Sequence, residues 1–436
     1  MVTKSSWIPL SQLCEAIVDC EHKTAPIQDS GIPSIRTTNI KNGRLDLETA
    51  NRVSEETYKL WTARLEPQPN DLILAREAPV GEVGIVPPGK RVCLGQRTVL
   101  IRPDGKKLFP RYLLYLLLTP EMRHELTCRA EGSVVPHLNM SDIRNFEIPL
   151  PPPLDEQKAI AQILSSLDDK IELNQQMNRT LEAIAHALFK SWFIDFDPVR
   201  AKLDGRQPAG MDAETVALFP AEFEDGGAIG KIPKGWKAVS LPEAIEVNPT
   251  RSLPKGKLAP YLDMQNMPTQ GHRPNGWIYR EFGSGTKFIQ GDTLLARITP
   301  CLENGKTAFV DFLPEGEVGW GSTEYIIFRP KAPLPSEFGY FLARSEELRN
   351  HAILNMTGSS GRQRVPADCF SSYLLTVPSD SIAQKFGEAA LSSMQLIKAN
   401  SEQNSTLASI RDSLLPKLLS GEIRVKEAEK IVAEVA

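Results

Sequence analysis

The stretch "IELNQQMNRTLEAI", Ile171–Ile184, returns later in the chain as "IKANSEQNSTLASI", Ile397–Ile410, with six of its fourteen positions identical. Its apolar residues recur at helical spacing, but polar residues interrupt them too often for an ordinary core helix. A helix of this kind is unstable alone, because half of its apolar face would be exposed to water. The repeat therefore predicts two long helices that pack against each other.

The repeat extends well beyond these helices, and its matches keep one order and an offset of 221 to 230 residues. The matched segments are "WIPLSQLCEAI" (from Trp7) with "WKAVSLPEAI" (from Trp236), "NDLILAR" (from Asn70) with "GDTLLAR" (from Gly291), "VLIRP" (from Val99) with "IIFRP" (from Ile326), and a loop holding Val135-Pro136 with one holding Val365-Pro366. A period this long indicates duplicated domains and not a solenoid of short units.

Each copy consists of a globular block, with short β-rich runs between Gly and Pro turns, followed by a long helix. This pattern predicts an α+β fold, with a further helix inside each block at Pro110–Glu125 and Ser336–Ile353. The expected organisation is a first block over 1–152, a long helix over 153–194, an acidic linker over 195–230 with a short helix at Ala213–Leu218, a second block over 231–379, a second long helix over 380–424 and a tail over 425–436.

The first long helix has heptad spacing, which is typical of a coiled coil. Its two columns are Ile160, Leu167, Asn174, Leu181, Leu188 and Leu164, Ile171, Asn178, Ala185, Trp192. Four asparagines fall in the middle of the two helices, namely Asn174, Asn178, Asn400 and Asn404. A buried Asn at such a seam costs stability but fixes the register, so we interpret them as register residues. The alternative is that they face solvent.

The bulk composition sets further bounds. A chain of 436 residues is too long for one core and predicts more than one domain. The six cysteines are scattered without metal-ligand spacing, which argues against a disulfide framework or a structural zinc. The N-terminus has no signal-peptide core, and the longest apolar run, Tyr112–Leu118, is too short to cross a bilayer. We therefore expect a cytoplasmic protein without a membrane partner.

Charge is distributed unevenly along the chain. Residues 151–229 contain seven Lys and Arg against 14 Asp and Glu, whereas residues 230–378 contain 17 against 14. Residues 1–150 contain 19 against 18. The two blocks are thus mildly basic, and each can present a positive face to nucleic acid.

Four short motifs resemble enzymatic ones, but each lacks a required part. "FGSG" (Phe282–Gly285) has no parallel-strand context, and "VNPTR" (Val247–Arg251) lacks the second proline and the aromatic of an amino-methyltransferase motif. "ENGKT" (Glu303–Thr307) lacks the first glycine of a phosphate loop, and "DFDPVRAK" (Asp195–Lys202) reads as solvated linker. The six histidines show no triad or metal spacing, and His186 is expected to be solvated. We predict no catalytic residue and no metal site.

Binding chemistry remains. Reading a DNA groove requires Arg, Lys, Asn and Gln on rigid elements, and such residues occur at matched places in both blocks. The candidates are Arg36, Thr37, Asn39, Lys41, Arg76, Arg97, Ser133, His137 and Asn139 in the first block, and Gln265, Asn266, Arg297, Lys306, Arg362, Gln363 and Arg364 in the second. For any one of them a surface charge or a structural salt bridge is the alternative.

The motifs resemble those of the specificity subunits of type I restriction–modification systems. The resemblance rests on Ile148–Val199 from "IPLPPPLDEQ" to "FDPV", on "LFPAEFEDGGAIGKIPKGW" (Leu218–Trp236), on "GQRTVLIRP" (Gly95–Pro103) and on "SLLPKLLSGEI" (Ser413–Ile423), and it covers essentially the whole chain. It implies two duplicated α/β target recognition domains in a pseudo-twofold arrangement, joined by two long antiparallel coiled-coil helices. Each domain would bind one half of a bipartite DNA site.

The resemblance also implies partners. The helices would set the spacing of the half-sites and dock two methyltransferase subunits, and restriction subunits would join them. S-adenosylmethionine, ATP and magnesium are expected on those partners, with no cofactor in this chain. Two alternatives stay open: a stand-alone DNA-modifying enzyme, and an assembly scaffold with degenerate recognition domains.

Overall fold

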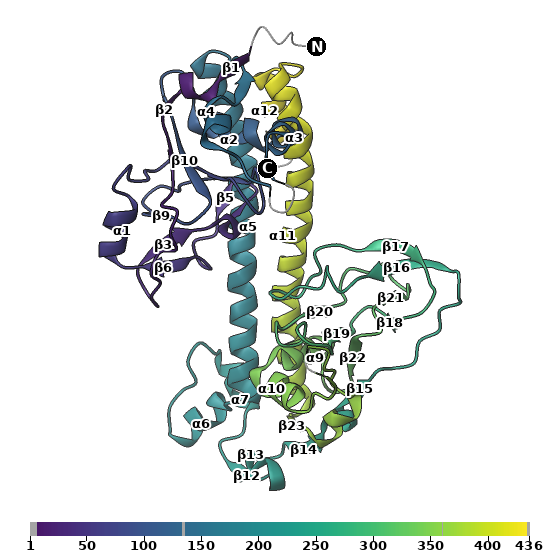
Figure 1. The fold of residues 1–436 in the computed structure, drawn as a ribbon. Helices are drawn as coiled ribbons and strands as arrows, with labels where there is room; N and C mark the ends of the chain where they lie inside the picture. Colours follow the sequence, from purple (N-terminus) through teal and green to yellow (C-terminus); the bar gives the residue numbers. More distant parts are fainter. Residues whose placement is uncertain (1–6, 133–135, 360, 434–436) are drawn as a thin grey trace. The chain divides into compact units, whose positions relative to one another are not determined.

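The computed structural model describes residues 7–132, 136–359 and 361–433 (Figure 1). The chain divides into two compact units, which we call the first unit (Met1–Glu172 with Asn404–Ala436) and the second unit (Leu173–Gln403). Two long helices cross this division without interruption, α5 (Leu154–Phe193) and α11 (Asp380–Ser420). Each unit therefore combines one globular block with about half of each long helix.

The first unit has a four-stranded antiparallel sheet in the order β2-β10-β7-β8, a second sheet in the order β6-β3-β9 and a pair of terminal strands, β1 with β11. Its elements before α5 are β1 (Trp7–Pro9), η2 (Leu10–Gln12), β2 (Cys14–Asp19), β3 (Ile32–Ile35), η3 (Thr37–Asn39), β4 (Ile40–Lys41), β5 (Arg44–Leu45), β6 (Asn51–Val53), α1 (Glu55–Trp61), β7 (Leu72–Ala75), β8 (Val83–Ile85), β9 (Cys93–Leu94), β10 (Thr98–Pro103), α2 (Pro110–Leu118), α3 (Pro120–Cys128), α4 (Met140–Arg144) and β11 (Glu147–Pro149).

The second unit repeats this plan, with a four-stranded sheet in the order β15-β22-β19-β20 and a terminal pair, β14 with β23. Its elements between the long helices are α6 (Asp197–Leu203), α7 (Ala213–Leu218), β12 (Phe223–Asp225), η4 (Gly227–Ile229), β13 (Lys231–Pro233), β14 (Lys237–Ser240), α8 (Leu241–Ala244), β15 (Ile245–Val247), β16 (Leu258–Leu262), β17 (Ile278–Glu281), β18 (Thr286–Phe288), β19 (Thr293–Ala296), β20 (Thr307–Phe309), β21 (Gly319–Gly321), β22 (Tyr325–Pro330), α9 (Ser336–Arg344), α10 (Glu346–Leu354), η5 (Ala367–Ser372) and β23 (Leu374–Val377). The predicted α+β fold with duplicated blocks is confirmed.

The single helix predicted in each block is wrong, because each is a pair of helices broken at a capping residue. Thr119 and Ser345 share the same extended backbone, with φ −63° and ψ 146°, and their hydroxyls accept the amide N–H of Met122 and Leu348. These side chains cap α3 and α10, which satisfies an amide that a helix start otherwise leaves unpaired. The same break in both copies is a further mark of the duplication.

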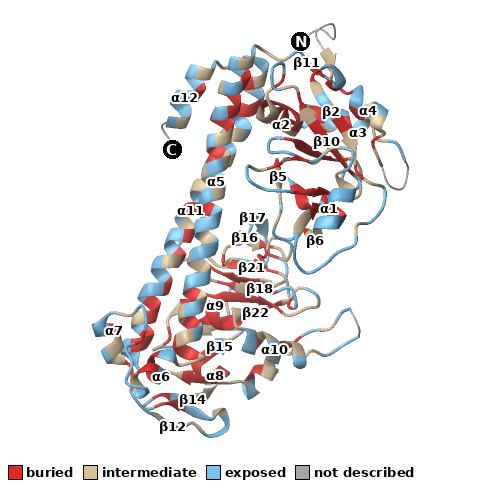
Figure 2. Cartoon of the chain, turned by 90° about the vertical axis from the view of Figure 1, so that its left-hand side faces the viewer, coloured by how far each residue is buried: buried red, intermediate tan, exposed pale blue. Residues whose placement is uncertain are grey.

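The long helices pack antiparallel in both units, as predicted. In the first unit, Leu164 and Leu167 of α5 share a core with Leu407 and Leu414 of α11. In the second unit, the ring of Phe189 on α5 lies 5.8 Å from that of Phe386 on α11. Figure 2 shows buried residues recurring between exposed ones along both helices. This is the arrangement that an amphipathic stripe dictates.

The segment predicted as an acidic linker, 195–230, is more ordered than expected. The predicted helix at Ala213–Leu218 is present as α7. Val199 and Phe219 are buried in the core of the second unit, and Phe219 packs 5.0 Å from Trp192. The expectation that "DFDPVRAK" is wholly solvated is therefore wrong. The tail likewise contains a helix, α12 (Val425–Ala433).

Among the described residues, no helix is both long enough and apolar enough to cross a bilayer.

Candidate nucleic-acid interface

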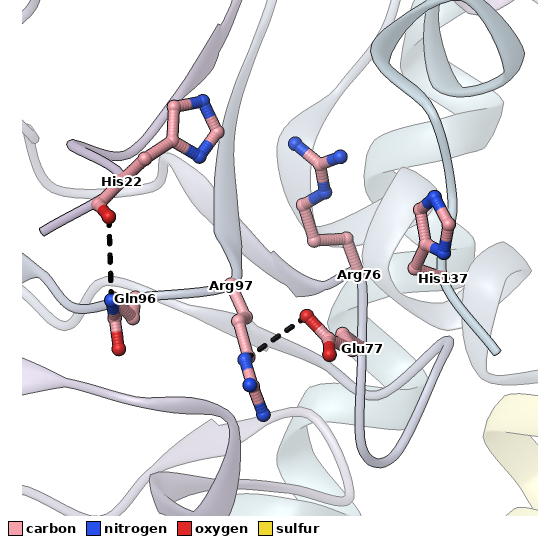
Figure 3. A pocket seen from close by; sticks show the side chains of 6 residues that line it. All are labelled: His22, Arg76, Glu77, Gln96, Arg97 and His137. Carbon is pink, nitrogen blue, oxygen red and sulfur yellow. Dashed lines mark hydrogen bonds and ion pairs between the residues drawn. The ribbon is translucent and has the colours of Figure 1, made fainter. Parts of the chain in front are cut away.

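Predicted DNA-binding residues of the first unit meet where β7 ends and β10 begins. Arg76 follows β7, its amide donates to the carbonyl of Arg97, and its own carbonyl accepts the amide of Leu138. These bonds bring together three segments that are distant in sequence. A cavity of about 220 Å³ lies at this place, and it is lined by His22, Arg76, Glu77, Gln96, Arg97 and His137 (Figure 3). We call these six residues the strand-end cluster of the first unit.

The cluster is polar and carries fixed charges. Arg97 Nε lies 3.0 Å from Glu77 Oε2, and the Arg97 side chain remains 53% exposed. Gln96 donates from Nε2 to the carbonyl of His22 at 3.4 Å. In Figure 3 the guanidinium groups of Arg76 and Arg97 point in different directions. Donors held in this way suit contacts to base edges and phosphates.

The turn at 36–41 divides its residues between structural and exposed roles. The hydroxyl of Thr37 donates to the carbonyl of Ala78 at 3.1 Å, and Asn39 accepts the amide of Arg36 at 3.1 Å. Thr37 and Asn39 are buried, whereas Arg36 and Lys41 are exposed. Thr37 and Asn39 thus hold the turn beside the strand-end cluster, and Arg36 and Lys41 are the side chains that reach solvent.

Two further candidates of the first unit lie beyond β10. Asn139 caps α4 in a box with Asp142, and its Nδ2 donates to Glu131 at 3.1 Å. Capping of this kind is sufficient by itself to explain an asparagine here. Ser133 lies outside the described residues.

The second unit has an equivalent strand end. Arg297 follows β19, its amide donates to the carbonyl of Glu324, and its carbonyl accepts the amide of Val365. The bonding pattern pairs Arg297 with Arg76 and Val365 with Leu138 of the first unit. The sequence match of Val135-Pro136 to Val365-Pro366 is therefore wrong, because Leu138 occupies the position of Val365. The two loops differ in length before these positions, so their short Val-Pro motifs do not occupy equivalent places.

Arg364 is the most firmly held side chain of this second strand end. Its Nε donates to both carboxylate oxygens of Glu324 at 2.9 Å, and its Nη2 lies 2.8 Å from Oε1. The hydrogen bonds that Arg364 donates to Glu324 raise the pKa of its guanidinium, so Arg364 stays charged. Its neighbour Arg362 is exposed, and the carbonyl of Gln363 accepts the amide of Thr299 at 3.0 Å.

The other candidates of the second unit lie beside β20. Lys306 donates from Nζ to the carbonyl of Met264 at 2.6 Å, which ties it to the segment that holds Gln265 and Asn266. The amide of Asn266 donates to Asp263 at 2.8 Å, whereas Gln265 is exposed. Gln265 is therefore the side chain of this group with the freest access to a ligand.

Three of the predicted register residues, Asn174, Asn178 and Asn400, make hydrogen bonds between the long helices. Asn400 donates to Asn178 at 2.8 Å and Asn174 donates to Gln403 at 2.7 Å, all within the second unit. Asn174 is almost fully buried, so the solvent-facing alternative does not hold for it. Asn404 lies in the first unit and is partly buried. The effect of these residues on register stays a prediction.

Sequence reasoning missed four residues of the two strand ends: His22, Glu77, Gln96 and Glu324. Glu77 and Gln96 directly adjoin Arg76 and Arg97, so adjacency was an available signal. His22 and Glu324 had none, since only the fold brings them into place. Among the described residues, no group of His, Cys, Asp and Glu is arranged to hold a metal ion.

The comparisons with known proteins agree with the sequence motifs. Residues 9–183 match the family described as "Type I restriction modification DNA specificity domain". The chain is 27% identical to the HindI specificity subunit of Haemophilus influenzae, over 74% of this chain and 80% of that one. It is 29% identical to the MjaIX specificity subunit of Methanocaldococcus jannaschii, over 86% and 82%.

A solved structure shares the fold. It is the S subunit of a type I restriction–modification system from M. genitalium, with a TM-score of 0.54, 16% identity and coverage of 96% of this chain and 98% of that one. The resemblance drawn from the sequence motifs is confirmed.

Proposed function

Because this chain is a relative of the specificity subunits of type I restriction–modification systems, we propose that it is the DNA-reading subunit of such a system, with each unit binding one half of a bipartite site. The observation that carries this proposal is the duplicated strand end. Arg76 and Arg297 occupy the same place in two copies of one fold, next to exposed basic side chains. The surrounding residues differ between the copies, so the two half-sites differ in sequence.

In this proposal the chain itself is not an enzyme. Methylation and ATP-dependent cleavage belong to methyltransferase and restriction subunits, which bring S-adenosylmethionine, ATP and magnesium. Two methyltransferase subunits are accommodated, one for each half-site. The complex works on DNA in the cytoplasm.

An apolar stripe on α5 supports docking of a methyltransferase subunit. Leu173, Met177 and Ile184 are 53%, 40% and 57% exposed and lie four and seven residues apart, on one face of the helix. Large exposed apolar side chains in one row are typical of a protein interface. The long helices thus serve two roles in this proposal: they hold the units at a fixed spacing and they carry partners.

The direct test is DNA binding by the complex of this chain with its methyltransferase subunits. The target is found first by mapping methylated adenines in DNA from cells that carry the whole system. At physiological salt, we expect the complex to bind a target duplex at least about 10³-fold more tightly than a random duplex. Equal binding of the two duplexes would refute the proposal, and methylation by this chain alone would favour the stand-alone enzyme.

Replacing Arg362, Gln363 and Arg364 together by alanine is expected to weaken target binding by roughly 2–4 kcal/mol, because a bidentate contact to a base is worth about 1–3 kcal/mol. Binding is measured on the complex by titration with labelled duplex. The control is the double variant Lys231→Ala, Lys237→Ala, which removes the same number of positive charges from exposed positions on β13 and β14. Unchanged affinity in the triple variant would support the degenerate scaffold instead.

A further inference from the structure

The two strand ends differ in where their charged side chains stand. In the first unit, Arg97 precedes β10 and pairs with Glu77, which follows Arg76. In the second unit, Glu324 precedes β22 and pairs with Arg364. Arg364 occupies the position that His137 takes in the first unit. The carboxylate Glu324 therefore occupies the position of Arg97, and the arginine of the second pair comes from the position of His137, whereas Ile298 occupies the position of Glu77. Arg76 and Arg297 occupy equivalent places in the two units.

Equivalent backbone contacts support this comparison. β7 ends with Ala75 opposite Thr98, and β19 ends with Ala296 opposite Tyr325. Isolated β-bridges join His137 to Glu77 and Arg364 to Ile298. Glu77 directly follows Arg76, and Ile298 directly follows Arg297. Arg97 and Glu324 are thus the same position of the fold, as are His137 and Arg364.

Each pair holds its arginine without covering it. Glu77 approaches Arg97 at Nε, and the terminal nitrogens of the guanidinium extend away from the carboxylate (Figure 3). Arg97 also has a left-handed backbone, with φ +68°, which a non-glycine residue rarely adopts. The Arg364 side chain is 46% exposed beyond its contact with Glu324.

An arginine in water samples many rotamers, and fixing it costs conformational entropy when it binds. A carboxylate that holds the guanidinium before binding removes part of this cost and fixes the direction of the remaining N–H donors. Such support is what a residue that reads bases requires. The neutral amide of glutamine would keep the shape but lose the charge-assisted contact.

We propose that Glu77 and Glu324 are positioning residues for DNA reading, Glu77 for Arg97 and Glu324 for Arg364, and that the different positions of these two arginines in the repeated fold make the two units read different half-sites. This inference rests on the proposed function. The inference adds the residues that position the arginines and so give each unit its sequence preference. Each carboxylate acts through its arginine and does not itself contact DNA.

The test uses Glu77→Gln and Glu324→Gln in the complex with methyltransferase subunits, with binding measured on duplexes that carry single substitutions in one half-site or the other. Glu77→Gln is expected to reduce discrimination by roughly tenfold in one half-site only, and Glu324→Gln in the other only. Glu77→Asp and Glu324→Asp should restore part of it, because they return the charge. General damage to folding would not be confined to one half-site.

The matched controls are Glu55→Gln and Glu222→Gln, which remove carboxylates that pair with Arg91 and Lys234 away from the strand ends. They should leave both half-site preferences unchanged. If the wild-type complex discriminates between duplexes but both glutamine variants keep its full profile, the positioning proposal is wrong and the proposed function stands. If the wild-type complex does not discriminate at all, the proposed function is wrong.

Discussion

Replacing His272 by glutamine is expected to lower the free energy of unfolding of the second unit by roughly 3–5 kcal/mol, because it removes the buried imidazole that lies between the carboxylates of Glu182 and Asp311. His272 is fully buried in the loop between β16 and β17. Its Nε2 lies 3.1 Å from Asp311 Oδ2, and its Nδ1 lies 3.5 Å from Glu182 Oε2 on α5. The imidazole thus joins the block to the long helix.

The surrounding groups show which contact depends on His272. Glu182 also accepts a hydrogen bond from the hydroxyl of Tyr340, and Arg273 Nε lies 3.2 Å from Asp311 Oδ1. The contact of Nδ1 with Glu182 has the length of an ion pair without good hydrogen-bond geometry, and neither atom has another hydrogen-bond partner among the described residues. Its strength therefore depends on the charge of the imidazole.

The effect should depend on pH. Burial alone would lower the pKa of His272, but hydrogen bonds and charges from Asp311 and Glu182 outweigh it and raise the pKa. Burial would raise the pKa of Glu182, but its contacts with the imidazoles of His186 and His272 hold this pKa well below the usual range. A raised histidine pKa stabilises the fold fully below about pH 6.5, and this contribution is lost as the pH rises through the folded-state value.

Glu182 sets the lower limit of the pH range in which this contact stabilises the fold. Its depressed pKa contributes stability above about pH 4.5, and this is lost only as the pH falls through the folded-state value. The stability difference between wild type and His272→Gln should thus be greatest between about pH 4.5 and 6.5 and should decrease at more alkaline pH.

Urea unfolding followed by tryptophan fluorescence measures this, because Trp192, Trp236, Trp277 and Trp320 all lie in the second unit and only Trp7 and Trp61 lie outside it. The control is His124→Gln, an exposed histidine of α3 in the first unit, which should unfold like wild type. A difference that is absent, or that grows with rising pH, would contradict the assigned role of the imidazolium.

The sequence predicted the features that depend on local pattern. Heptad spacing predicted the two long helices, because apolar residues recur in every turn of such a helix. The collinear repeat predicted the duplicated blocks, because matching segments recur along both copies. The pairing at the second strand end could not be predicted without the fold, since Glu324 and Arg364 are 40 residues apart in sequence and meet only in the folded chain. The prediction of a solvated His186 is wrong for the same reason: its ring packs 4.9 Å from that of Phe341, which no pattern around His186 reveals.

Lengthening both long helices by one heptad is expected to lengthen the spacer of the DNA site by roughly three base pairs and to leave both half-sites unchanged. Seven helical residues add about 10 Å, and DNA rises about 3.4 Å per base pair. The insertions belong between Glu172 and Leu173 and between Gln403 and Asn404, where both helices cross the division between the units. A heptad turns the helix by only about 20° from two full turns, so the packed faces stay aligned.

Matching the two insertions matters because α5 and α11 are antiparallel, and a longer α5 alone would place Asn178 out of register with Asn400. The double insertion should reduce affinity for the original site by about 10³-fold or more, to the level of random DNA, and restore it on a site with the longer spacer. Mapping methylated adenines in cells gives the new spacer directly. Seven residues inserted between Arg206 and Gln207, in the exposed loop between α6 and α7, should change nothing. An unchanged spacer after the double insertion would show that the helices do not set it, whereas the reading of the half-sites by the two units would be unaffected.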